Sequence, residues 1–94
     1  MKNPSKLVGH ILDFHLGGHR KKQCGFHTGL VIEVIMFKDN VRIRHIVVNL
    51  MNPMTRKYDG RTIKLDSNEW EPNWCGVEVD KKCIPVKDWL NEEV

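Results

Sequence analysis

No stretch of this sequence is apolar for long enough to cross a membrane as a helix, which needs about 20 residues. Cysteine is scarce, and its 3 copies cannot all pair within one molecule, so a disulfide-stabilised fold is not expected. The first residues lack the apolar region and small-residue cleavage site of a secretion signal. These absences predict one soluble domain, residues 1–94, in a reducing, cytoplasmic setting.

Motifs of common enzymes are also missing. The segment LGGHRKK at residues 16–22 has glycine and lysine, but it lacks the GxxxxGK sequence between a strand and a helix that holds nucleotide phosphates. Cys24 lies close to His27, as a nucleophile and its base would, yet no third group that orients the histidine is evident. The chain is therefore predicted not to be an enzyme, and no cofactor is expected.

Acidic residues are few in the first two thirds of the chain. Residues 1–64 contain 12 of the 15 Lys and Arg but 4 of the 12 Asp and Glu, and residues 65–94 contain the other 3 and 8. This asymmetry favours an anionic partner for the first segment, with nucleic acid the commonest candidate. The alternative is that the acidic segment neutralises the basic one within the molecule.

Two runs rich in Val and Ile are the strongest structural pattern. They span residues 26–37 and 41–51 and flank the turn-forming Lys38-Asp39-Asn40, which predicts a long antiparallel hairpin. The first run is apolar on both faces, so it is expected to be buried on both sides.

The apolar positions of the second run change parity between Ile43 and Ile46. A parity change within one strand predicts a β-bulge, with one of Arg44, His45 and Ile46 left unpaired. The remaining expected elements are a strand at Leu7–Phe14, a second hairpin of Thr55–Tyr58 and Arg61–Leu65 with a type I′ turn at Asp59-Gly60, a short strand at Val77–Val79 and a helical turn at Val86–Glu92.

The succession of GLVIEV at 29–34, VRIR at 41–44, Glu69-Trp70 and VEV at 77–79 resembles the small SH3-like barrels of the KOW and Tudor kind. It is also similar to very small bacteriophage proteins of that type. Together with the strands expected above, this resemblance predicts a mainly β fold. The expected fold is a small, antiparallel, partly open SH3-like barrel of five to six strands with a short C-terminal helical turn. The resemblance implies a binding platform for nucleic acid or protein, without catalysis.

The predicted function is binding of nucleic-acid phosphates through a basic sheet face and the basic loop at 15–25. The alternative is a protein–protein interaction module, such as a viral regulator that docks on a host protein through a sheet edge or the acidic C-terminal segment. No membrane partner is expected, and the sequence predicts no particular oligomeric state. The expected phosphate contacts are Arg20, Lys21, Lys22, Arg42, Arg44, Arg56, Lys57, Arg61 and Lys64.

Two further groups have more than one interpretation. The spacing of His15, His19, Cys24 and His27 is compatible with one zinc ion, but surface histidines beside phosphate-binding lysines, or ordinary packing, explain it as well, and no metal is predicted. The three tryptophans of the acidic segment, Trp70, Trp74 and Trp89, suit either base stacking or core packing. Packing is favoured because nearby carboxylates repel phosphate.

Overall fold

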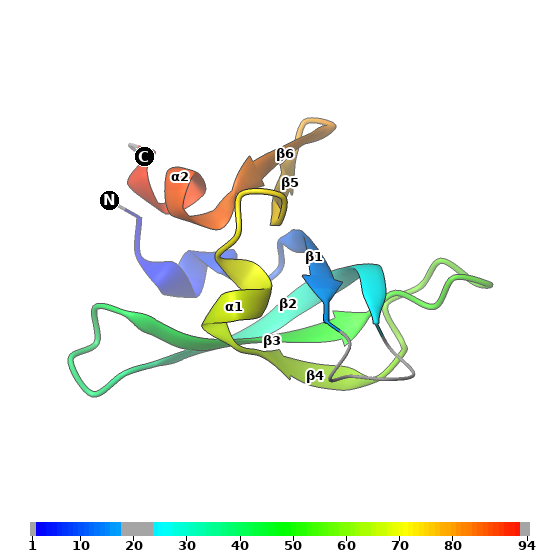
Figure 1. Ribbon diagram of the computed structural model, residues 1–94, viewed down its shortest axis with the longest axis horizontal. Helices are drawn as coiled ribbons and strands as arrows, with labels where there is room; N and C mark the ends of the chain where they lie inside the picture. Colours follow the sequence, from blue (N-terminus) through cyan, green and yellow to red (C-terminus); the bar gives the residue numbers. More distant parts are fainter. Residues whose placement is uncertain (1, 18–23, 93–94) are drawn as a thin grey trace.

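The computed structural model describes residues 2–17 and 24–92. Its main feature is a six-stranded antiparallel sheet in the order β4-β3-β2-β1-β5-β6, so β4 and β6 are edges and the sheet is not closed (Figure 1). The mainly β, partly open architecture predicted from the sequence is thus confirmed. The elements are η1 Pro4–Leu7, β1 Ile11–Leu16, β2 Gly25–Met36, β3 Ile43–Leu50, β4 Thr62–Leu65, α1 Ser67–Trp70, β5 Gly76–Val79, β6 Lys82–Pro85 and α2 Val86–Asn91.

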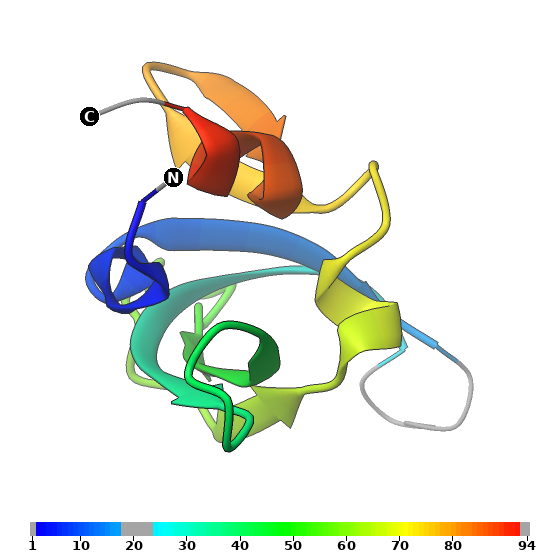
Figure 2. The ribbon, with the colours of Figure 1, turned by 90° about the vertical axis from the view of Figure 1, so that its left-hand side faces the viewer.

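The sheet curls around a single core, and α1 lies at its open side in contact with β1, β3 and β4 (Figure 2). Phe14 is fully buried in this core, while Trp70 and Trp89 pack into it at 4% exposure. Core packing is therefore confirmed for these two tryptophans. Trp74 is 65% exposed and does not follow the packing prediction, because it precedes β5 in a turn outside the core.

The predicted bulge is present at Arg44. Ile35 pairs with His45 and Met36 pairs with Ile43, so Arg44 has no partner in the ladder. This extra residue reverses the parity of β3 and brings the later apolar residues of that strand back toward the core.

A second bulge in β2 corrects the prediction that this strand is buried on both faces. Val31 pairs with Val48 and Glu33 pairs with Val47, which leaves Ile32 between them without a partner. Ile32 is 38% exposed, and the bulge turns it away from the core.

The first strand begins at Ile11, so the predicted start at Leu7 is wrong. The Asn3 side chain accepts a hydrogen bond of 3.0 Å from the Ser5 amide and caps a short 3-10 helix that begins at Pro4. Gly9 then adopts a φ of 92°, a conformation that favours glycine and separates this helix from the strand.

The predicted second hairpin is also wrong. β4 pairs with β3, and residues 51–61 form the loop between them instead of a strand at Thr55–Tyr58 and a type I′ turn. Gly60 is not in the positive-φ region. A Cβ there would lie 2.7 Å from the Leu50 carbonyl oxygen, so the glycine permits a close approach of two backbone segments.

Besides η1, two further elements were not expected. β6 forms a hairpin with β5, and α1 begins at a capping box in which the Asp66 amide donates to the Glu69 carboxylate at 3.0 Å. The predicted C-terminal helix is confirmed as α2. Within the described residues, no helix is long and apolar enough to span a membrane.

Candidate functional site

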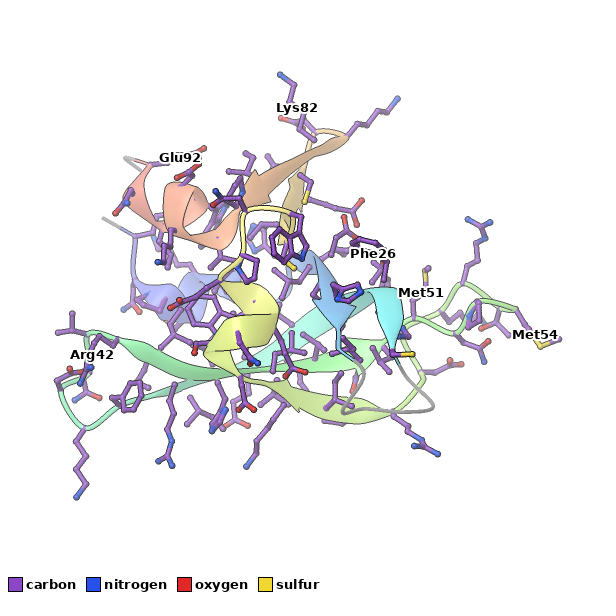
Figure 3. All side chains as sticks on the ribbon, in the orientation of Figure 1. Phe26, Arg42, Met51, Met54, Lys82 and Glu92 are labelled. Atoms are coloured by element: carbon purple, nitrogen blue, oxygen red, sulfur yellow. The ribbon has the colours of Figure 1, made fainter. Side chains whose placement is uncertain are left out.

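Two grooves lie at opposite ends of the molecule. The larger, here called the loop groove, has a volume of about 710 Å³ and lies where the β1–β2 ladder meets the loop of residues 51–61. Phe26 and Met51 lie at this end, and Arg42 lies at the other (Figure 3). A volume of this size is within the range of ligand pockets, about 300–1,000 Å³. The groove is lined by Asp13, Phe26, His27, Thr28, Met51 and Arg61, among others.

Strand register places the polar and aromatic groups of the loop groove. Asp13 of β1 lies directly opposite Thr28 of β2, and the Thr28 Oγ1 donates a 2.7 Å hydrogen bond to Asp13 Oδ1. His15 lies opposite Phe26 on the same face of the ladder, with the two rings edge to face at 4.9 Å. The Phe26 side chain is nevertheless 76% exposed. A phenyl ring this exposed on a regular strand offers a free face for stacking.

The loop of residues 51–61 forms the opposite wall. The Met51 amide donates to the Thr28 carbonyl at 2.9 Å, which ties the start of the loop to β2. The Asn52 amide donates to the Lys57 carbonyl at 2.8 Å, and the Arg56 amide donates to the Asn52 carbonyl at 2.7 Å. These bonds close the loop on itself, so the exposed side chains of Arg56 and Lys57 are carried on a compact turn.

Acidic groups lie near this wall. Partial burial, followed by the nearby Glu78 and Asp13 carboxylates, raises the pKa of Tyr58 above its ordinary value. Burial and Asp13 likewise raise the pKa of Glu78. The described residues that line the loop groove therefore include one guanidinium, that of Arg61, and one carboxylate, that of Asp13.

The smaller groove, here called the hairpin-tip groove, has a volume of about 390 Å³ and lies between the β2–β3 turn, α1 and α2. Its wall includes Phe37, Arg42 and Arg44. The guanidinium carbon of Arg42 lies 4.7 Å from the Phe37 ring centre, and that of Arg44 lies 5.9 Å from it. Both cations therefore interact with one aromatic ring, whose faces are partly occupied.

Asp39 organises this tip. Its Oδ1 accepts hydrogen bonds from the Val41 and Arg42 amides at 2.9 and 3.2 Å, and its Oδ2 accepts one from Arg42 Nε at 2.8 Å. The Val41 amide first, and then the Arg42 side chain and amide, lower the pKa of Asp39 to about 2. Such bonds stabilise the ionised carboxylate.

We expect the Asp39 carboxyl to titrate near pH 2 instead of its ordinary 3.8. Because the folded-state pKa is depressed, its stabilising effect on the tip is complete above pH 3.8 and is lost as the pH falls through about 2. An NMR titration of the carboxyl carbon measures this directly. An Arg42→Gln variant should move the pKa back toward 3.8. A wild-type carboxyl that titrates at its ordinary pKa would contradict the observed hydrogen bonds.

The predicted phosphate contacts that belong to the described residues lie in several separate places. Arg42 and Arg44 lie at the hairpin tip, Arg61 lines the loop groove, and Lys64 lies on β4 opposite Val47. Arg56 and Lys57 belong to the loop of residues 51–61, and Arg20, Lys21 and Lys22 lie outside the described residues. Sequence reasoning missed Asp13, Phe26 and Thr28. The available signal was a carboxylate at the centre of the apolar strand ILDFHL.

Of the candidate zinc ligands within the described residues, His15 and His27 lie on opposite faces of the β1–β2 ladder. His15 and Phe14 are neighbours on β1 and face opposite sides, and the His27 ring stacks on Phe14 at 6.1 Å. His19 lies outside the described residues. In the ranges 2–17 and 24–92, no group of three or more His, Cys, Asp or Glu side chains is placed to hold a metal ion.

Burial raises the pKa of the thiols of Cys75 and Cys83 above the ordinary value. These thiols therefore stay protonated at neutral pH and are poor nucleophiles.

No protein-family model, curated protein or solved structure matches this chain. The resemblance to KOW and Tudor barrels and to bacteriophage proteins accordingly stays a prediction.

Proposed function

We propose that this domain is a non-enzymatic module that binds single-stranded nucleic acid in the loop groove. The observation that carries the proposal is the 76% exposure of Phe26 beside a groove with Arg61 in its wall. Binders of single strands combine stacking on aromatic side chains with a cationic path for the backbone. In this arrangement a base stacks on Phe26, while Arg61 and the neighbouring Arg56 and Lys57 contact phosphates.

The carboxylates near the loop groove are compatible with this arrangement. Asp13 lies on β1 and is held by Thr28, whereas Arg61 lies in the loop that forms the opposite wall, and Arg56 and Lys57 are exposed on the same loop. In this arrangement the phosphate backbone follows the loop of residues 51–61, and the bases point toward β1 and β2. The hairpin tip is a weaker candidate, because Asp39 pairs with Arg42, and Glu71 lies 3.8 Å from Lys87.

Fluorescence anisotropy with a labelled twelve-nucleotide oligothymidylate tests the proposal. We expect a dissociation constant on the order of 1–100 μM at low salt, because the binding is mainly electrostatic and stacking in origin. The logarithm of affinity should fall with the logarithm of salt concentration at a slope of about −0.7 per phosphate contact. No binding of DNA or RNA at low salt, with a protein partner retained from nuclease-treated lysate at high salt, would favour the interaction module instead.

A further inference from the structure

Among the described residues that line the loop groove, Asp13 is the one with an acidic side chain. Its Oδ1 accepts the 2.7 Å hydrogen bond from Thr28, which fixes the orientation of the carboxylate. In the part of the chain that the structure describes, Asp13 is in none of the salt bridges. A carboxylate offers about four lone-pair sites on its two oxygens, so the Thr28 bond leaves most of them for a ligand.

A carboxylate in such a place can distinguish between bases, whereas stacking on an aromatic ring does not. An ionised carboxylate only accepts hydrogen bonds, and its two oxygens suit two parallel donors. Guanine has such a pair, the N1–H and the 2-amino group, on its Watson–Crick edge. Cytosine and thymine each offer one donor with acceptors beside it, and adenine presents an acceptor next to its amino group. Single-stranded bases are free to present this edge to a protein.

We propose that the loop groove selects guanine, with the base stacked on Phe26 and its N1–H and 2-amino group donating to Asp13. This inference rests on the proposed binding of single strands and adds a base preference to it. Thr28 acts as a positioning residue, because it holds the carboxylate in place and does not itself contact the base.

The test compares two labelled oligothymidylates of twelve nucleotides, one with a single central guanine and the other with inosine at that position. Inosine lacks only the 2-amino group, so the difference isolates one of the two proposed hydrogen bonds. A good bidentate contact discriminates by about 1–3 kcal/mol, so the loss of one of its bonds should weaken wild-type binding by about five- to tenfold.

Asp13→Asn should reduce this guanine-to-inosine ratio to about one, because the amide replaces one acceptor by a donor. The variant is isosteric, and Thr28 can still donate to its carbonyl oxygen, so the fold should persist. Thr28→Val should lower the ratio partially, since the carboxylate loses its support. The matched control is Asp39→Asn at the hairpin tip, which makes the same chemical change and should leave the ratio as in the wild type.

Equal wild-type affinity for the two oligonucleotides, or a guanine preference that survives Asp13→Asn, would overturn the guanine assignment alone. Failure of both oligonucleotides to bind at low salt would refute the proposed function, and the base preference with it. The two failures are therefore distinguishable in one set of titrations.

Discussion

Replacement of three cations of the 51–61 loop by glutamine, as Arg56→Gln, Lys57→Gln and Arg61→Gln together, should weaken binding of oligothymidylate by roughly five hundredfold at about 50 mM salt. Each phosphate contact on a single strand releases about 0.7 of a counterion, and at this salt concentration each release contributes nearly a factor of ten to affinity. Anisotropy titrations of the wild type and the triple variant measure the effect.

Glutamine removes the charge but is polar and unbranched at Cβ like the residues it replaces, so it adds no strain to the left-handed backbone of Arg56, where φ is 59°. Thermal unfolding by circular dichroism should therefore show a Tm near that of the wild type. A loss of affinity below about threefold in a folded triple variant would mean that these residues do not contact phosphates.

Gly76→Ala should destabilise the domain by about 3 kcal/mol or more, one of the largest effects available to a single methyl group. Gly76 lies between β1 and β6, opposite Asp13 on one side and Pro85 on the other. A Cβ there would collide with the Ile84 carbonyl oxygen and lie 2.5 Å from the carbonyl carbon and 2.9 Å from the Pro85 nitrogen. These are backbone atoms, so the β5–β6 hairpin must open to make room.

For a domain of this size, such a loss should lower the Tm by more than about 10 °C, measured by circular dichroism or calorimetry. Lys82→Ala, on the exposed face of the same hairpin, serves as the control and should change stability by less than about 0.5 kcal/mol. A Gly76→Ala protein that melts within a few degrees of the wild type would show that the hairpin is less closely packed than described.

The sequence predicted the features that depend on local chemistry. The turn at residues 38–40 follows from turn-forming residues, and Asn40 there adopts a φ of 56°. The Arg44 bulge was visible as a change of apolar parity, and the C-terminal helix as an amphipathic segment after Pro85. Each of these signals lies within a few residues of the structure that it specifies.

Features that depend on long-range pairing were not predictable in the same way. Asp-Gly at residues 59–60 is a strong hairpin signal, yet Gly60 serves here to let the loop approach Leu50. The bulge at Ile32 is not marked by any switch of the apolar positions from one strand face to the other, because both faces of that run are apolar. The loop groove joins residues of β1, β2 and a distant loop, so only the register of the sheet brings Asp13 and Arg61 to one site.

The measurement that most directly tests binding at the loop groove compares two charge-matched triple variants. Arg56, Lys57 and Arg61 are replaced by glutamine in one, and Lys38, Arg42 and Arg44 in the other. Both lose three positive charges, so a purely global electrostatic attraction would affect them equally. For oligothymidylate, the plot of log affinity against log salt has a negative slope. The magnitude of this slope should fall by about two units in the loop variant and by less than about half a unit in the tip variant. Equal decreases, or a larger decrease in the tip variant, would contradict binding at the loop groove.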